Sequence, residues 1–291
     1  MSTTLLLCSG QVNLLCLNIC KIMKELIITW SQTPCPLARW SYWGLGDMLR
    51  GTLSIYRLAK KRGYKITVDT HLHPLSTFTT HSKSEHSEFI EKNQQKIHMF
   101  HMSLDLEHEI DCADWIENSK LFCMCNHGNI QIDQVITQEE QEFLKSIIEP
   151  TLDVQTEIDQ LVSTLPENYT VLNVRFSEER LKNNPQQFNL RKFKFTKKPT
   201  DVLISNSLPF KKQMNVPFMN HEPGHIGYEK DIERVKYAFI EFHIMANSKE
   251  IRTYSEYPWV SGYALWASKI YNVPIVNLNP KIKENGIVNP V

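Results

Sequence analysis

The sequence predicts an α/β protein with two Rossmann-like domains that face one another across a cleft. Short runs of aliphatic and β-branched residues alternate with helical stripes, as they do in parallel sheets covered by helices. This alternation occurs twice, in two blocks that join near Pro166. The 291 residues, of which 42% are hydrophobic, can bury the cores of two domains of about 100–150 residues each.

The pattern divides the chain into an extension over residues 1–23, an N-terminal domain over 24–166 and a C-terminal domain over 167–291. The extension is apolar, but polar residues such as Asn13 interrupt it before it reaches a clean span of about 20 apolar residues. It also lacks the basic start of a secretory signal. Because "MKELIITWS" at Met23 is a natural domain start, we interpret residues 1–22 as appended or mis-started. A weak membrane anchor is the alternative.

The first block opens with an isoleucine-rich run over residues 24–30, which predicts a buried strand. Gly44 and Gly46 follow at a strand-to-helix crossing, where glycines bring backbone N–H groups close to a ligand. A helical stripe of apolar residues begins at Met48, and Gly63 suits the C-cap of that helix. A second strand is expected directly after this cap.

Further along the chain, the histidine- and lysine-rich residues 81–101 are expected to form a surface helix or a loop. Thr137 and Glu140 make a capping box that begins a helix ending before Pro150, and another helix follows. The second block is expected to contain strands over 169–176 and 201–207, a long helix over 228–248, and a helix and last strand within 259–278.

Charge and cysteine content limit the function classes. The 32 basic and 32 acidic residues cancel, so no global field favours nucleic acid or an anionic membrane as partner. Seven cysteines are an odd number and are scattered, which is a poor disulfide framework and favours a reducing, cytoplasmic compartment.

Polar residues follow the expected strands of the second block, where open α/β sheets bind ligands. A serine and a glycine at a helix start form a phosphate cradle, and an arginine adds charge for a diphosphate. Taken singly, the arginine can be an ordinary salt-bridge residue and the serine–glycine pair a simple helix cap. The candidates are Arg175, Glu178, Ser205, Asn206, Ser207, Ser255, Ser261 and Gly262.

The order "GLGDMLRG", "VLNVRF", "DVLISNS" and "SEYPWVSGYALWA" resembles the superfamily of α1,2-, α1,6- and protein O-fucosyltransferases. The resemblance covers roughly residues 24–278. It implies a GT-B-type fold and an inverting, metal-independent transfer of a sugar to a hydroxyl group of a glycan or protein. The implied donor is GDP-fucose in the first place, and no further cofactor is implied. Many relatives are Golgi-resident, and such a location would need the N-terminal apolar stretch as an anchor.

By this resemblance, Arg175 matches the phosphate-binding arginine of the first C-terminal motif, which reads roughly H-x-R-R-x-D. The chain departs from that motif with Asn173 for the histidine and Phe176 for the second arginine. Asn173 can still bind a purine edge, whereas Phe176 carries no charge. The resemblance also implies contacts to the nucleoside from Ser205, Asn206 and Ser207, and to the diphosphate from Ser255, Ser261 and Gly262.

In the same family the N-terminal glycine loop lines the cleft, which places Gly44, Gly46, Asp47 and Arg50 near the reacting sugar. Inverting transfer needs a base for the acceptor hydroxyl and positive charge for the departing diphosphate. Asp47 is the first candidate for the base and Glu178 the second, while Arg175 stabilises the leaving group. The alternative for Asp47 is that it caps the helix expected after Gly46.

Other interpretations stay open. Cys123, Cys125 and His127 resemble a fragment of a zinc site, but a second ligand pair is missing from the sequence nearby. Trp40 and Trp43 are expected to belong mostly to the core, although they flank the glycine loop and can stack on a sugar. His225 can reach the cleft, but a place on the surface is favoured. A function of a different class is also open, in which the protein binds a nucleotide sugar or a glycan on the same fold but has lost catalytic activity. A plain nucleotide enzyme is disfavoured, because "GLGDMLRG" has its third glycine too late for G-x-G-x-x-G.

Overall fold

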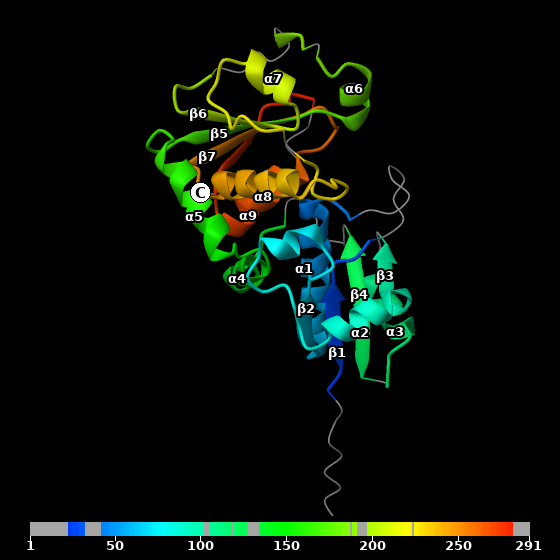
Figure 1. The fold of residues 1–291 in the computed structure, drawn as a ribbon. Helices are drawn as coiled ribbons and strands as arrows, with labels where there is room; N and C mark the ends of the chain where they lie inside the picture. The colour runs from blue at the N-terminus through cyan, green and yellow to red at the C-terminus, as the bar shows by residue number, and fades with distance from the viewer. Residues whose placement is uncertain are drawn as a thin grey trace, which may run out of the picture.

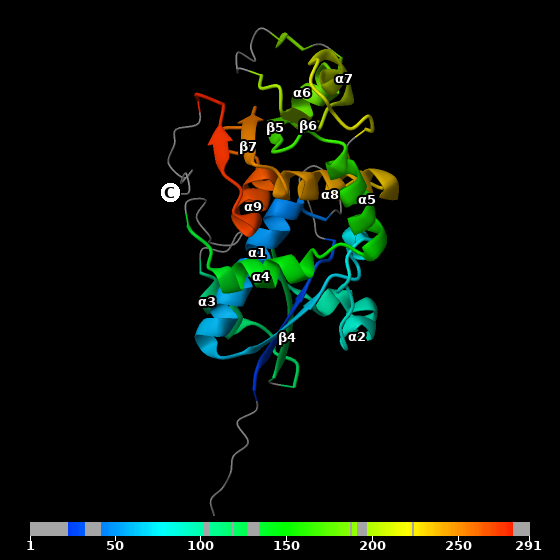
Figure 2. The same cartoon turned by 90° about the vertical axis from the view of Figure 1, so that its left-hand side faces the viewer.

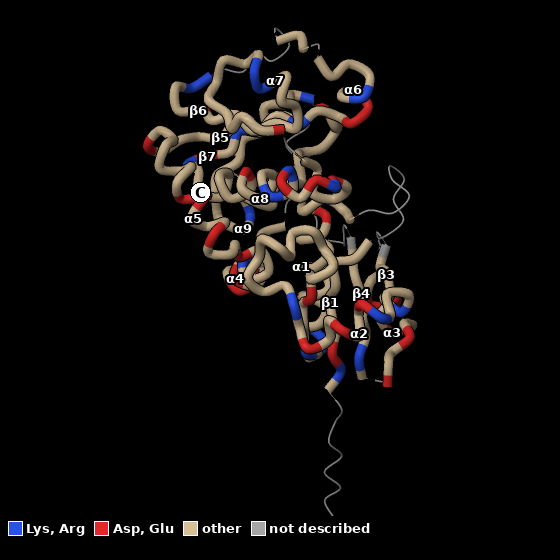
Figure 3. Tube along the Cα trace, viewed as in Figure 1, with Lys and Arg blue, Asp and Glu red and all other residues tan. Residues whose placement is uncertain are grey.

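The computed structural model describes residues 23–32, 42–101, 105–117, 119–126, 134–186, 188–190, 197–222 and 224–281. The extension over residues 1–22, Trp40 and His127 lie outside the described residues. Within them the α/β class is confirmed, since two four-stranded parallel sheets follow one another along the chain (Figure 1). Acidic and basic residues are interspersed over both halves (Figure 3).

The first sheet has the strand order β2-β1-β4-β3. Its strands are β1 (Glu25–Thr29), β2 (Lys65–Asp69), β3 (His98–His101) and β4 (Lys120–Asn126). The helices of this half are α1 (Leu45–Arg62), α2 (Ser87–Lys92) and α3 (Leu106–Cys112), with the 3₁₀ turns η1 (Pro74–Thr77) and η2 (Gln94–Lys96). Every residue of β1 is buried, as its isoleucine-rich sequence predicts for a central parallel strand.

Two expectations for this half need correction. Helix α1 begins at Leu45, before Gly46, although it ends as predicted with Gly63 in the left-handed conformation at φ 65°. The stretch expected as a surface helix or loop contains α2 and also the edge strand β3, which pairs with β4. The two central residues of this strand, Met99 and Phe100, are apolar, but the histidines on either side hide the strand in the sequence.

The second sheet has the strand order β6-β5-β7-β8. Its strands are β5 (Thr170–Arg175), β6 (Asp201–Ser205), β7 (Glu250–Ser255) and β8 (Ile275–Asn277). The helices of this half are α6 (Glu178–Asn183), α7 (Leu208–Gln213), α8 (Ile232–Ala246) and α9 (Gly262–Tyr271). Helices α4 (Gln138–Ile147) and α5 (Leu152–Ser163) connect the two sheets, and α4 carries the predicted capping box.

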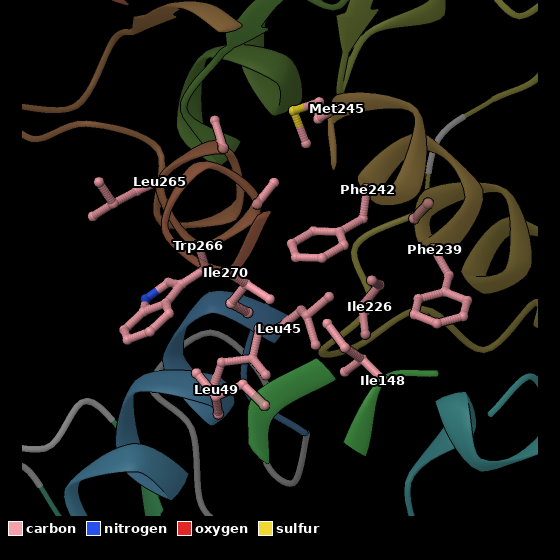
Figure 4. Packing of buried hydrophobic residues seen from close by; sticks show 14 of the residues in the cluster. Leu45, Leu49, Ile148, Ile226, Phe239, Phe242, Met245, Leu265, Trp266 and Ile270 are labelled. Carbon is pink, nitrogen blue, oxygen red and sulfur yellow. The ribbon is translucent and has the colours of Figure 1, made fainter. Parts of the chain in front are cut away.

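The two halves share one apolar core. Helices α8 and α9 lie between the second sheet and the N-terminal half, and α1 packs directly against α9 (Figure 2). Leu45 and Leu49 of α1 meet Trp266 and Ile270 of α9 in this cluster (Figure 4). This shared burial holds the starts of α1 and α9 beside one another. None of the helices in the described part of the chain is both long and apolar enough to cross a membrane.

Two buried histidines predict sensitivity to acid. His73 is 1% exposed between Trp30 and Tyr42, and His243 is 4% exposed in α8. Burial lowers the pKa of His73 to about 3 and that of His243 to about 4. Between these values and the unfolded pKa, the unfolded chain binds more protons than the folded one, so stability falls as the pH falls.

Each histidine should therefore cost about 2 kcal/mol of unfolding free energy on going from pH 8 to pH 5. Urea denaturation at the two pH values measures this loss. His243→Leu should reduce the loss, whereas the exposed His81→Asn should leave it unchanged. An unfolding free energy with equal pH dependence in wild type and His243→Leu would contradict the assignment.

Candidate functional site

A cavity of about 390 Å³ lies where the ends of β5 and β6 meet the starts of α1 and α9 and the segment over residues 224–228. It receives side chains from both halves of the chain. The sequence-predicted residues that line it are Gly44, Gly46, Asp47, Asn173, Arg175, Glu178, Ser205, Asn206, Ser261 and Gly262.

The two glycines of the opening turn have different tasks. Gly44 is the N-cap residue of α1 and borders the cavity. Gly46 lies against the start of α9, because a Cβ atom placed on it would be 2.7 Å from the carbonyl carbon of Gly262 and 2.8 Å from its oxygen. The missing side chain at Gly46 thus allows the two helix starts to touch backbone to backbone.

Arg175 and Glu178 form an ion pair at the end of β5. The Tyr228 hydroxyl donates to Glu178 Oε1 at 3.3 Å, so this one oxygen is bound by both Arg175 and Tyr228. Asn206 fixes the same turn, since its Oδ1 accepts from the N–H of Phe176 and its Nδ2 donates to the carbonyl of Phe176, both at 2.9 Å. These hydrogen bonds fix the end of β5, from which the side chain of Arg175 projects.

Phe176 belongs to the core and not to the cavity wall. Its side chain is fully buried, with ring centroids 4.9 Å from Phe188 and 4.8 Å from Phe210. Successive residues of a strand point to opposite faces, so Phe176 turns away from the cavity that Arg175 lines. The charge that the fucosyltransferase motif carries at this position is accordingly absent from the site.

Two serine hydroxyls of the site make no hydrogen bond within the part of the chain that the structure describes. Ser205 is 1% exposed, and its buried Oγ has no hydrogen-bond partner among the described residues. Ser261 is the N-cap residue of α9 but makes no side-chain capping bond. A buried hydroxyl without a partner costs free energy, so both are suited to bind a polar ligand in the cavity.

The starts of α1 and α9 both border the cavity, and each brings unpaired backbone N–H groups and the positive end of a helix dipole. Arg175 adds a formal positive charge. Asp47, Glu178 and Glu241 add negative charges to the wall. The arrangement can hold an anion at the helix starts and a proton acceptor beside it.

Three predicted residues do not line the cavity. Ser207 caps α7, with its Oγ accepting from the N–H of Phe210 at 3.3 Å. The hydroxyl of Ser255 accepts from the N–H of Tyr257 at 3.2 Å and thereby shapes the turn after β7. Arg50 lies in α1 one turn after Asp47; burial lowers its pKa, against the opposing effect of that carboxylate.

Asp47 is not a helix cap. The N-cap position of α1 belongs to Gly44, and Asp47 is the third residue of the helix. The capping alternative is therefore wrong. A Cβ atom on Gly44 would be 3.4 Å from Asp47 Oδ2, which places that oxygen at the turn that borders the cavity.

His225 lines the cavity, so its expected place on the surface is wrong. Its Nδ1 accepts from the N–H of Gly227 at 3.1 Å, and its ring stacks on Tyr228 with centroids 3.8 Å apart. Burial and the nearby charge of Arg175 lower the pKa of His225 to about 3. The ring is thus neutral at pH 7, and with Nδ1 accepting, Nε2 carries the proton and can donate to a ligand.

Two other cavity residues were not among the candidates from the sequence, and they come from a loop and a helix. Trp259 is 52% exposed, lines the cavity, and stacks on Tyr257 with centroids 5.2 Å apart. Glu241 comes from the middle of α8. A tryptophan after a proline in a loop was the available signal for Trp259, whereas Glu241 lies in an ordinary helical pattern.

The cysteines considered for a zinc site lie in β4. Cys123 and Cys125 are buried in the core of the first sheet, and burial raises the pKa of the Cys123 thiol. Elsewhere in the described residues, Glu25, Glu85 and His86 form a group with metal-ligand spacing, but Lys65 Nζ already lies 2.8 Å from Glu25. Neither set belongs to the cavity.

Comparison with known proteins yields matches among solved structures. No family model and no curated protein matches the chain. NodZ alpha-1,6-fucosyltransferase co-crystallised with GDP matches with a TM-score of 0.51 and 13% identity, over 88% of this chain and 95% of that one. The chain is similar in fold to NodZ.

Two further NodZ structures agree. The enzyme soaked with GDP-fucose has a TM-score of 0.51 and 14% identity, over 92% of this chain and 100% of that one. The fucosyltransferase NodZ from Bradyrhizobium has a TM-score of 0.50 and 15% identity, over 88% and 96%. At such low sequence identity, the similarity to NodZ shows the fold alone.

Proposed function

We propose that the protein is an inverting, metal-independent glycosyltransferase that transfers a sugar to a hydroxyl group of a glycan or a protein. The expected donor is GDP-fucose, so the expected sugar is fucose. One observation carries this proposal. Polar residues that the sequence places at separate strand and helix ends gather around one cavity. The cavity lies in a fold similar to that of enzymes crystallised with GDP and GDP-fucose. In this proposal it is the cleft between an acceptor-side domain (24–166) and a donor-binding domain (167–291).

The diphosphate of the donor would lie at the start of α9. Backbone N–H groups and the Ser261 hydroxyl would donate to its oxygens, and Arg175 would supply two parallel N–H donors. Arg175 pairs with Glu178 in the free protein, so a diphosphate has to replace that carboxylate. Tyr228 holds Glu178 aside when this exchange occurs.

Transfer would then proceed by displacement at the anomeric carbon. Asp47 takes the proton of the acceptor hydroxyl, whose oxygen forms the new bond to the anomeric carbon on the face opposite the diphosphate. The bond between that carbon and the diphosphate oxygen breaks, and its electron pair leaves with GDP. Arg175 and the Nε2–H group of His225 stabilise the negative charge that develops on the leaving oxygen.

The second candidate is a protein that binds a nucleotide sugar or a glycan without transfer. The observation that favours it is the charge of the described cavity wall, where the carboxylates of Asp47, Glu178 and Glu241 accompany a single arginine, Arg175. Such a wall binds a diphosphate more weakly than one with two arginines.

Slow hydrolysis of GDP-fucose distinguishes the two candidates, because a transferase passes its sugar to water when no acceptor is present. We expect GDP release from wild type to persist in EDTA and to fall about 100-fold or more in Asp47→Asn, which removes the base. Asp153→Asn, on the exposed face of α5, is the matched control. Equal rates in wild type and Asp47→Asn would exclude Asp47 as base, and no release at all would favour the binding protein.

A further inference from the structure

Glu241 lines the cavity from the middle of α8, where the transfer mechanism gives it no task. Lys211 of α7 donates to its Oε1 at 2.6 Å, and both side chains are almost fully buried, at 0% and 3% exposed. His221 Nε2 lies 3.4 Å from the same oxygen. Within the described part of the chain, Oε2 of Glu241 accepts no hydrogen bond.

The fold does not explain this buried charge. Moving two ions out of water costs about as much as their attraction returns, and apolar residues of equal volume are often as stable. A carboxylate at a cavity wall, with one oxygen bound by a lysine and the other unoccupied, is a hydrogen-bond acceptor that is already desolvated and oriented. Such a group is suited to ligand recognition.

The position of Glu241 corresponds to the nucleoside and not to the diphosphate. Asn173 and Arg175 project from the same face of β5, two residues or about 7 Å apart, with Arg175 at the strand end. Asn173, and Ile204 beside it in β6, therefore lie further from the strand ends than Arg175, and Ala238 and Glu241 of α8 line the same cavity. A nucleotide with its diphosphate at Arg175 would extend its base into this inner part.

We propose that Glu241 recognises guanine, with its carboxylate accepting hydrogen bonds from the N1–H and N2–H groups of the base. This inference rests on the proposed function, because it places a nucleotide in the cavity. Guanine presents two adjacent N–H donors on this edge, whereas uracil presents one N–H between two carbonyl groups and adenine presents a lone pair at N1. A carboxylate pairs with the first and repels the other two.

Asn173 complements this recognition. Its Oδ1 accepts from the hydroxyl of Thr253 at 3.1 Å, which leaves its amide N–H groups for the O6 acceptor of guanine. The unpartnered hydroxyl of Ser205 is a further donor or acceptor within the same cavity. The inner wall thus offers an acceptor and donors in the pattern that guanine requires.

Calorimetric titration with GDP, IDP and UDP tests the proposal, because IDP lacks only the 2-amino group. Wild type should bind GDP about 10-fold or more tightly than IDP, and UDP more weakly still. Glu241→Gln alone leaves Lys211 buried without its counter-ion and can unfold the protein. The informative variant is therefore Lys211→Met/Glu241→Gln, which removes both charges and should reduce the preference for GDP over IDP.

The matched control is Lys236→Met/Glu157→Gln, which removes a partly exposed lysine–glutamate pair between α8 and α5. It should keep the preference for GDP, and circular dichroism should show both double variants folded. Equal affinity of wild type for GDP and IDP, or an unchanged preference in Lys211→Met/Glu241→Gln, would overturn the role of Glu241 alone. Absence of binding by all three nucleotides would overturn the donor site as well.

Discussion

Arg175→Ala is expected to weaken GDP binding about 100-fold or more, because two charge-assisted hydrogen bonds to the diphosphate are lost. Among the described residues that line the cavity, Arg175 is the one arginine, so no second guanidinium there can replace it. Arg175→Lys keeps the charge without the planar fork and should lose about 10-fold. Isothermal titration calorimetry with GDP measures both effects.

Arg234→Ala is the matched control for this experiment. Arg234 pairs with Glu222 on the surface and is not part of the cavity wall, so its loss should leave the affinity for GDP unchanged. An Arg175→Ala variant that binds GDP within a factor of about 3 of wild type would show that the diphosphate lies elsewhere.

Gly46→Ala is expected to destabilise the protein by about 3 kcal/mol, at the upper end of what overpacking costs. An alanine inside a helix normally gains about 1 kcal/mol over glycine, so the sign should be reversed here. The reason is the position of the new Cβ atom, 2.7 Å from the backbone of Gly262, because backbone atoms cannot rotate away as a side chain does. Urea denaturation measures the loss.

Gly262→Ala provides the control at the other side of the same contact. A Cβ atom there meets no other atom within 4 Å, so the change should alter the unfolding free energy by less than about 1 kcal/mol. Similar stabilities of Gly46→Ala and Gly262→Ala would mean that α1 and α9 do not touch as closely as the structure shows.

Periodicity in the sequence was sufficient to predict the α/β class and most elements of the second sheet. Strand β4 (Lys120–Asn126) was missed, although it is central to the first sheet. Its core residues include Cys123, Met124 and Cys125, which are buried without being β-branched, so the run reads as a metal-binding fragment instead of a strand. Strand β3 was missed because histidines occupy its ends.

The site was predictable where chain connectivity alone determines position. The carboxyl ends of neighbouring parallel strands meet at one edge, so the order of strands along the chain is enough to assign Asn173, Arg175 and Ser205 to one place. His225 and Glu241 reach the cavity through the path of a loop and the rotation of a helix, which depend on long-range packing. Ser207 and Ser255 were predicted at the ligand but do not line the cavity. The hydroxyl of a serine after a strand accepts a hydrogen bond from a nearby backbone N–H as readily as it binds a ligand.

A crystal structure of the protein with saturating GDP is the decisive test of the proposed donor site. We expect the diphosphate between Arg175 and the start of α9, with Glu178 displaced from the arginine and the guanine edge facing Glu241. GDP bound outside this cavity, or an empty cavity at saturating GDP, would contradict the claim that these residues form the donor site.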